Sequence, residues 1–392
     1  MKMIDNIPIW GSPVDTGALS QIKMCLETAD RVALMADHHK GYSCPIGGVV
    51  AYKNAISPSC VGYDIACGNK AVKLEVDPRY VIDNISTFMD SIQSTISFGI
   101  GQKNNTRVEH ELFDDELWSS NILKPLKEMA RNQLGTVGSG NHFVDVFLGD
   151  DNHIWVGVHF GSRGLGHKIA TYFLNAGGAE NGMDSPPLVL DVNSDLGEAY
   201  IEHMTLAGRY AYAGRDWACA AVANILGGVI IDEVHNHHNY AWEETLPNNE
   251  TYWVVRKGAT PAYPSQRGFI GSSMGESSVI IKGLENKFGL ASMYSTVHGA
   301  GRVMGRMEAK GKVNRKTGEI KRKGKISRDM MNNWLRSAKV ELRGGDVDES
   351  PDCYKRLTDV LNEHKGMIEV ERVLRPIGVC MAGAGEFDPY KD

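Results

Sequence analysis

The sequence predicts a mixed α/β fold in one large domain, and three observations support this. Short runs rich in β-branched and aromatic residues recur along the chain, each bounded by Gly, Asp, Asn or Pro, and stretches with helical periodicity lie between them. The 43 glycines are spread over all 392 residues, which is typical of a loop-rich α/β protein. No Pro/Ser-rich linker and no fixed-period repeat divides the chain, so we expect a single domain over 1–392.

The apolar runs predict strands at 31–36, 70–76, 142–148, 154–160, 188–192, 252–257 and 278–283. The longest helical pattern covers 196–234, where Ala, Leu and Met recur at spacings of three and four. Residues 302–328 hold eleven Lys or Arg against two Glu, and we expect a basic, hairpin-like insertion that turns at Thr317 and Gly318. Such a segment is either a solvated surface or the counter-charge for a phosphate-rich polymer.

Composition excludes several classes of protein. Hydrophobic residues make up 42% of the chain, which allows a sizeable core and excludes global disorder. The net charge of -6 argues against a non-specific nucleic-acid coat, but a local basic track stays open. We expect a cytoplasmic protein without a membrane partner, because there is no signal-peptide pattern and no run near the ~20 apolar residues that span a bilayer. The seven cysteines are odd in number and lack CxxC spacing, which leaves at least one free thiol.

Four short turns carry side chains suited to metal binding. Asp64 and Cys67 lie three apart in "VGYDIACGNK", and "GSGNHFVDV" presents His142 after an asparagine. His159 ends an apolar run, and "EVHNHHNYAWEE" holds three histidines. Taken alone, each histidine is as readily a structural residue as a metal ligand. Together, single scattered donors that include a carboxylate favour a catalytic site, with two ions bridged by the thiolate or carboxylate, over a structural zinc site.

A further histidine, His298, lies in "YSTVHGAGR" (294–302). The dense glycines leave backbone N–H groups beside an imidazole, and such groups suit phosphate oxygens. Imidazole can act as a nucleophile. The alternative is a buried turn with a hydrogen-bonded histidine.

These motifs, in this order, resemble those of the RtcB family of GTP-dependent RNA ligases. The resemblance runs from "MADHHKGYSCPIGGVV" (35–50) to "RPIGVCMAG" (375–383). It covers the aspartate–cysteine turn, Asn-His-Phe, His-x-Gly-Ser-Arg-Gly, His-Asn-Tyr, Arg-Lys-Gly-Ala-Thr, Ser-Met-Gly and His-Gly-Ala-Gly-Arg. The family implies an α/β fold with a central, metal-containing active-site cleft.

The same resemblance implies an activity that uses two Mn²⁺ ions and GTP. A 2′,3′-cyclic phosphate or 3′-phosphate RNA end is joined to a 5′-hydroxyl end, in RNA repair or tRNA splicing. The implied substrate is RNA with broken ends, tRNA or rRNA. An archease-like activator is implied for some relatives.

Carried over motif by motif, the resemblance assigns roles to particular residues. The implied metal ligands are Asp64, Cys67, His142, His159 and His238, the last because it directly precedes Asn239-Tyr240. The implied nucleophile that takes GMP is His298. The implied nucleotide contacts are Asn141, Asp145, Ser273, Ser278, Ala300, Gly301 and Tyr354, and the expected phosphate clamps are Arg163, Arg302 and Arg306.

Three departures from the family concern the guanine pocket. Ala382 stands where the family has a lysine, Asp145 replaces a longer glutamate, and Gly271 replaces a proline. Each lost hydrogen bond is worth about 0.5–3 kcal/mol, so we expect altered base selectivity and retained chemistry. Lys391 in the tail is a candidate replacement cation.

Two other functions stay open. The altered pocket favours a metal-dependent phosphohydrolase or cyclic phosphodiesterase without nucleotide activation. The third candidate is an RNA-end-binding protein without turnover, which would need neither the nucleophile nor the complete ligand set.

Overall fold

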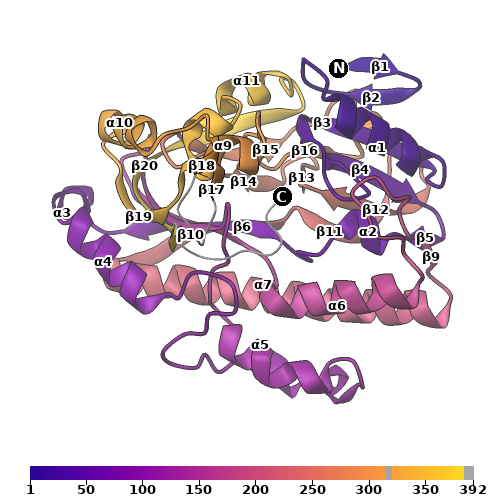
Figure 1. Ribbon diagram of the computed structural model, residues 1–392, viewed down its shortest axis with the longest axis horizontal. Helices are drawn as coiled ribbons and strands as arrows, with labels where there is room; N and C mark the ends of the chain where they lie inside the picture. The colour runs from indigo at the N-terminus through magenta and orange to yellow at the C-terminus, as the bar shows by residue number, and fades with distance from the viewer. Residues whose placement is uncertain (314–319, 384–392) are drawn as a thin grey trace.

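The computed structural model describes residues 1–313 and 320–383, and these form a mixed α/β fold, as predicted (Figure 1). Strands of two large sheets make up its centre. The helices α6 (Arg163–Ala176) and α7 (Asp195–Leu226) run along one side, with α5 (Lys127–Gln133) beyond them (Figure 1). On the opposite side lie α10 (Arg328–Ala338) and α11 (Leu357–Asn362). No helix among the described residues is long and apolar enough to cross a bilayer.

The first sheet has the strand order β1-β2-β3-β4-β12-β11. Its strands are β1 (Lys2–Ile4), β2 (Ile7–Ile9), β3 (Arg31–His39), β4 (Ile46–Tyr52), β12 (Thr251–Lys257) and β11 (Asn239–Thr245). The central strands β3 and β4 are almost wholly buried, as near-continuous apolar runs predict. Helix α1 (Thr16–Leu26) packs beside them and begins at Asp15, whose carboxylate accepts from the amide of Ala18 at 2.7 Å.

The second sheet has the order β10-β6-β8-β7-β20-β15-β14, and β19 pairs with β20. Its strands are β10 (Val229–His237), β6 (Gly68–Glu75), β8 (Ile154–Phe160), β7 (Phe143–Gly149), β20 (Ile368–Gly383), β15 (Ser278–Gly283), β14 (Arg267–Ile270) and β19 (Glu341–Gly345). The two edge strands approach each other. Asn236 of β10 accepts from the amide of Phe269 on β14 at 3.1 Å, and Asn69 donates to the carbonyl of Phe269 at 2.8 Å. The sheet therefore curls towards closure.

Helix α7 covers one face of this curled sheet. It begins at Ser194, whose hydroxyl accepts from the amide of Gly197 at 3.1 Å. Its apolar side packs Cys219 and Val222 against strand residues such as Val156. The predicted helix over 196–234 is wrong at its C-terminal end, because α7 ends at Leu226. The cap Gly227 is left-handed (φ 70°), and the β-branched run that follows forms β10.

The remaining elements are short. The helices are α2 (Pro58–Val61), α3 (Pro78–Asp83), α4 (Ile85–Thr95), α8 (Gly289–Ser292) and α9 (Arg306–Lys310). The paired strands are β5 (Ala55–Ile56) with β9 (Leu190–Asp191), β13 (Ala259–Pro261) with β16 (Ser295–Val297), and β17 (Gly311–Val313) with β18 (Ile320–Lys323). Single 3₁₀ turns cover Glu111–Asp114, Glu116–Ser119, Lys124–Leu126, Val347–Glu349 and Pro351–Cys353.

The strand predictions mostly agree with the structure. The runs at 142–148, 154–160, 252–257 and 278–283 match β7, β8, β12 and β15 within one residue at either end. The run at 188–192 forms only the two-residue β9. Within the basic segment 302–328, β17 and β18 pair antiparallel as a hairpin would, and the predicted turn at 317–318 lies outside the described residues. That this segment is an insertion in a single domain of 1–392 stays a prediction.

Candidate active site

Four of the five predicted metal ligands lie at one edge of the second sheet. Cys67 directly precedes β6, and His142 directly precedes β7. His159 is the penultimate residue of β8, and His238 directly follows β10. These neighbouring strands pair antiparallel, so the starts of β6 and β7 meet the ends of β8 and β10. Strand pairing therefore brings four separate segments to one place.

The donor atoms of all five predicted ligands form one continuous chain. Cys67 Sγ lies 3.2 Å from Nε2 of His159 and 3.5 Å from Nε2 of His142. Nε2 of His142 lies 3.1 Å from a carboxylate oxygen of Asp64. At the other end, Nε2 of His159 lies 3.3 Å from Nε2 of His238. We call Asp64, Cys67, His142, His159 and His238 the donor cluster.

Two imidazoles of the donor cluster, those of His159 and His238, have the neutral form that a metal ligand needs. Nδ1 of His159 donates to the carbonyl oxygen of Asn141 at 3.0 Å, which leaves the lone pair on Nε2. Burial lowers the pKa of His159 and of His238 well below the usual value, so both stay neutral, which is the ligand form. Nδ1 of His142 and of His238 is buried without a hydrogen-bond partner in the described part of the chain. This arrangement fits a metal ion.

Asp64 and Cys67 have opposite pKa shifts. Burial raises the pKa of Asp64, but the hydrogen bond with His142 and the charge of that histidine outweigh burial, so the pKa lies below its usual value. Burial, followed by the negative charge of Asp64, raises the pKa of the Cys67 thiol well above its usual value. A thiol ligand must lose its proton, so a metal ion bound by Cys67 would release a proton, and its binding would strengthen as pH rises.

His298 lies next to the donor cluster and is held by a buried carboxylate. Its ring centroid is 4.8 Å from that of His238. One oxygen of Asp37, in β3, accepts from Nδ1 of His298 at 2.7 Å and from the amides of His298 and Gly299 at 3.0 and 3.2 Å. Burial raises the pKa of Asp37, but the charge and hydrogen bonds of His298 outweigh it and hold the pKa below its usual value. Donation from Nδ1 leaves the lone pair on Nε2.

The glycines after His298 let this turn pass against β3. Gly301 has φ +76°, and a Cβ there would lie 2.3 Å from the carbonyl oxygen of Asp37. Only glycine fits this approach. Asp37 itself was not predicted, although a charged residue inside the apolar run "RVALMADHH" was a signal for it.

Arg215, on α7, supports the donor cluster from behind and was also not predicted. Its wholly buried guanidinium donates to the carbonyl of Ala66 at 3.0 Å and to that of Phe160 at 2.6 Å, the neighbours of Cys67 and His159. It also donates to the rings of His235 at 2.8 Å and His237 at 2.9 Å. These two histidines therefore face Arg215, whereas His238 faces the donor cluster.

The predicted nucleotide contacts gather on three adjacent segments. The carbonyl oxygen of Gly271 would lie 3.3 Å from a Cβ on Gly299, and the carbonyl oxygen of Gly301 accepts from the amide of Lys355 at 2.9 Å. Arg356 pairs with Glu276 at 2.9 Å. These contacts join 271–278, 299–302 and 354–356, which contain Ser273, Ser278, Ala300, Gly301 and Tyr354. Asn141 meets the donor cluster through its backbone carbonyl.

The three predicted phosphate clamps already hold protein partners. Arg163 donates to the hydroxyl of Thr136 at 3.0 Å and to the carbonyl of Gly99 at 2.7 Å, and its charge lowers the pKa of Asp64. Arg302 donates to the hydroxyl of Tyr354 at 2.9 Å. Arg306 pairs with Asp348 at 3.0 Å and with Glu349. Binding of phosphate by Arg302 or Arg306 therefore requires an exchange of partners, and the clamp roles stay predictions.

Asp145 carries a buried carboxyl group, one of whose oxygens lacks a hydrogen-bond partner among the described residues. Alternation along β7 places it on the same face as Phe143, whose ring lies 5.4 Å from that of His159. Its Oδ1 has no hydrogen-bond partner among the described residues, and burial raises its pKa well above the usual value. An unpaired buried carboxyl is costly, and at a functional site it is typical of a group that meets a ligand. Ala382 lies buried near the end of β20.

Comparison with known proteins identifies the family. The family model described as "tRNA-splicing ligase RtcB" matches residues 19–382. RNA-splicing ligase RtcB1 of Escherichia coli (strain ATCC 25922) is 30% identical over 97% of this chain and 98% of its own. RNA-splicing ligase RtcB of Escherichia coli K12 is 29% identical over the same shares. The tRNA-splicing ligase RtcB of Thermococcus kodakarensis is 26% identical over 88% of this chain and 86% of its own. The chain belongs to the RtcB family.

Proposed function

We propose that this protein is an RNA ligase that joins 2′,3′-cyclic phosphate or 3′-phosphate ends to 5′-hydroxyl ends through a guanylated His298. Membership of the RtcB family and the printed names of the relatives support the ligase activity. The observation that carries the histidine chemistry is the hydrogen bond from Nδ1 of His298 to Asp37 at 2.7 Å. It leaves Nε2 as the nucleophilic nitrogen beside the donor cluster.

The bond changes in the proposed reaction balance as follows. Nε2 of His298 attacks the α-phosphorus of GTP, an N–P bond forms, and pyrophosphate leaves. Water opens the cyclic phosphate of the RNA to a 3′-phosphate. An oxygen of that phosphate attacks the bound guanylate and breaks the N–P bond. The 5′-hydroxyl then attacks the activated phosphorus, forms the phosphodiester bond and releases GMP.

Asp37 is proposed to stabilise the guanylated form of His298 during this reaction. When Nε2 bonds to phosphorus while Nδ1 keeps its hydrogen, the imidazole becomes cationic. The buried carboxylate of Asp37 stabilises that cation, as the aspartate of a catalytic triad stabilises its imidazolium. The backbone amides of His298 and Gly299 fix the same carboxylate oxygen, so the ring has one orientation.

The donor cluster is proposed to hold two Mn²⁺ ions through Asp64, Cys67, His142, His159 and His238. Bound there, divalent ions supply positive charge for phosphate oxygens and lower the pKa of a bound water. Support comes from the donor chain itself and from the neutral imidazoles of His159 and His238. This donor set also suits Zn²⁺ and Co²⁺, so manganese rests on the family resemblance.

Asp145 is proposed to read the guanine base. The Watson–Crick edge of guanine carries adjacent N–H donors, and Oδ1 of Asp145 lacks a partner among the described residues. The other proposed nucleotide contacts are Asn141, Ser273, Ser278, Ala300, Gly301 and Tyr354. The side chain of Asp145 is one methylene group shorter than the family's glutamate, so its carboxylate meets the base at a different distance from the strand. This difference is the proposed cause of altered base selectivity.

RNA with broken ends, tRNA or rRNA, is the proposed substrate, and part of the basic segment is available to it. Arg302, Arg306 and Lys310 pair with carboxylates at 346–349. Lys312, Lys321 and Lys323 on β17 and β18 are exposed and have no ion pair in the described part of the chain. These lysines suit a phosphate backbone. Need for an archease-like activator, and a role in RNA repair or tRNA splicing, are proposals from the resemblance alone.

A ligation assay tests the proposal. RNA carrying a 2′,3′-cyclic phosphate and RNA carrying a 5′-hydroxyl are mixed with the protein, MnCl₂ and GTP, and the joined product is resolved on a gel. We expect GTP-dependent joining that His298→Ala abolishes. Opening of the cyclic phosphate without joining and without guanylated protein would instead identify the metal-dependent phosphodiesterase that the altered guanine pocket favours. RNA binding without any turnover would identify the third candidate.

A further inference from the structure

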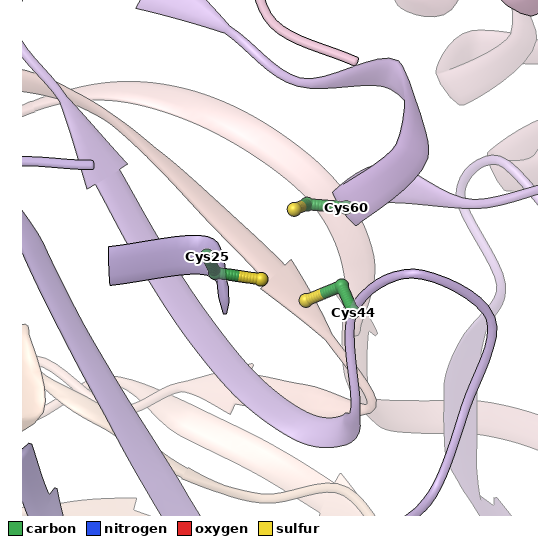
Figure 2. A group of neighbouring side chains, drawn as sticks. All are labelled: Cys25, Cys44 and Cys60. Carbon is green, nitrogen blue, oxygen red and sulfur yellow. The ribbon is translucent and has the colours of Figure 1, made fainter. Parts of the chain in front are cut away.

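Three buried cysteines outside the donor cluster converge on one another (Figure 2). Cys25 lies on α1, Cys44 on the loop between β3 and β4, and Cys60 on α2. All three are free thiols with no exposed surface, and their Sγ atoms lie within 4.8 Å of one another. Figure 2 shows the three sulfurs pointing towards a common centre. Separations of 19 and 16 residues in the sequence give no hint of this thiol cluster.

The surroundings of the thiol cluster offer the sulfurs only weak neutral partners. Cys25 Sγ lies 3.9 Å from the carbonyl oxygen of Ser43, and Cys44 Sγ lies 3.8 Å from that of Pro45. The hydroxyl of Tyr52 lies 4.0 Å from Cys60 Sγ. Among the described residues, no imidazole or carboxylate joins the three sulfurs as a further donor. The donor set is therefore soft, which distinguishes it from the mixed donor cluster.

A buried cation lies in the same region. Lys257, only 6% exposed, donates from Nζ to the carbonyl of Tyr42 at 2.6 Å and to that of Ser59 at 3.3 Å. No carboxylate of the described residues pairs with it. A buried ammonium held by two neutral carbonyls favours negative charge nearby, and Ser59 is the neighbour of Cys60.

A cavity lies beside the segments that carry two of the three cysteines. It has a volume of about 260 Å³, and Ser43, Ser59 and Lys257 are among the residues that line it. Ser43 and Ser59 directly precede two of the three cysteines. The cavity therefore brings polar surface and the ammonium of Lys257 to the residues next to Cys44 and Cys60, while the sulfurs themselves have no exposed surface.

We propose that Cys25, Cys44 and Cys60 form a second metal site, which holds one thiophilic d¹⁰ cation, Zn²⁺ or Cu⁺, through three thiolates. Binding breaks three S–H bonds, forms three metal–sulfur bonds and releases three protons to solvent. Zinc with three thiolates carries one negative charge, which the ammonium of Lys257 balances. Zinc–sulfur bonds of about 2.3 Å place three sulfurs about 4 Å apart around one ion, and the Sγ atoms here lie within 4.8 Å of one another.

The bound ion would join three segments that precede the donor cluster. Helix α1, the β3–β4 loop and α2 share no backbone hydrogen-bond ladder with one another, and α2 ends three residues before Asp64. The site is thus structural: it fixes the approach of the chain to Asp64 and Cys67. It does not depend on the proposed ligase activity.

Metal content tests the site, with Cys67→Ala as the parent protein so that the donor cluster contributes no sulfur. The reduced, chelator-treated parent is loaded with ZnCl₂ or, anaerobically, with Cu⁺, then desalted and analysed for metal per chain. The histidines of the donor cluster can still hold metal, so the readout is a difference: we expect Cys44→Ala to bind about one ion per chain fewer than the parent, and the matched buried-cysteine control Cys380→Ala to bind as much as the parent. If Cys44→Ala loses the ion only after loading with copper, or only after loading with zinc, that metal is the ion that the site holds. Equal content in Cys44→Ala and Cys380→Ala for both metals overturns the proposal.

A second measurement does not depend on folding of a cluster variant. The Cys67→Ala parent is saturated with zinc and desalted, and X-ray absorption at the zinc edge reports the ligand atoms. Because the donor cluster of this parent holds no sulfur, zinc–sulfur scattering supports the site. A shell of only nitrogen and oxygen, as the histidines of the donor cluster would give, overturns it.

Discussion

Replacement of Asp37 by Asn tests whether the carboxylate of Asp37 stabilises the cationic, guanylated ring of His298. The amide is nearly the same size, and its oxygen can still accept from Nδ1 of His298 and from the two backbone amides that Asp37 now binds. The negative charge is lost, and an NH₂ group takes the place of Oδ1, which has no hydrogen-bond partner among the described residues. Two unit charges about 4 Å apart interact by about 4 kcal/mol at an effective dielectric constant of about 20. Guanylation makes the ring of His298 cationic, so we expect it to slow by about 10³-fold.

The assay follows transfer of label from [α-³²P]GTP to the protein in the presence of MnCl₂, on a denaturing gel. Asp151→Asn is the matched control, because Asp151 pairs with Lys73 at 2.9 Å in the turn between β7 and β8 and does not contact His298. Circular dichroism confirms that both variants are folded. A folded Asp37→Asn protein that is labelled within about tenfold of the wild-type rate would refute the assigned role of the carboxylate.

Three further predictions concern neighbouring groups. His298→Ala should abolish labelling while His235→Ala retains it, because His235 faces Arg215; equal loss in both would contradict this assignment. Arg215→Lys should weaken Mn²⁺ binding about 10–100-fold in a calorimetric titration, since one ammonium cannot hold two carbonyls and two rings; unchanged affinity would remove Arg215 from a supporting role. Asp145→Asn should raise the free energy of unfolding by about 1–3 kcal/mol at pH 8 and lower GTP-dependent labelling. Burial raises the pKa of Asp145 in the folded protein above its value in the unfolded chain. As pH rises above about 4, the unfolded chain loses this proton while the folded protein retains it, so the fold is destabilised. The gain in the free energy of unfolding from Asp145→Asn should therefore vanish near pH 4 in urea titrations; a gain independent of pH would contradict this.

Local patterns predicted several strands, but they missed others, among them β4, β11 and β20, and they missed one helix end. The alternation and β-branched content of β7, β8 and β15 placed them within a residue. The helix over 196–234 was extended too far, because apolar residues continue through Val229–Ile231 and Val234, although their β-branched type differs from the Ala and Leu of the helix. The glycine pair at 227–228 was the available signal, and the pairing of β10 with β6 settles the outcome.

The candidate site was predictable where chemistry clusters in short motifs and unpredictable where distant residues meet. The five ligands and His298 each lie in a distinctive turn. Asp37 is 261 residues away from His298, and no local pattern links them. Arg215 lies in a helix whose spacing predicts only an amphipathic face. The three cysteines of the thiol cluster meet through tertiary packing alone, since their spacing matches no metal-binding hook.

Guanylation of His298 is tested by intact-mass measurement of the protein after incubation with MnCl₂ and GTP, followed by peptide mapping. We expect a mass increase of one guanylate, located on the peptide that contains His298, absent without the metal and reversed by pyrophosphate. Guanylate on any other residue, or no adduct while the same preparation joins RNA ends, would contradict it.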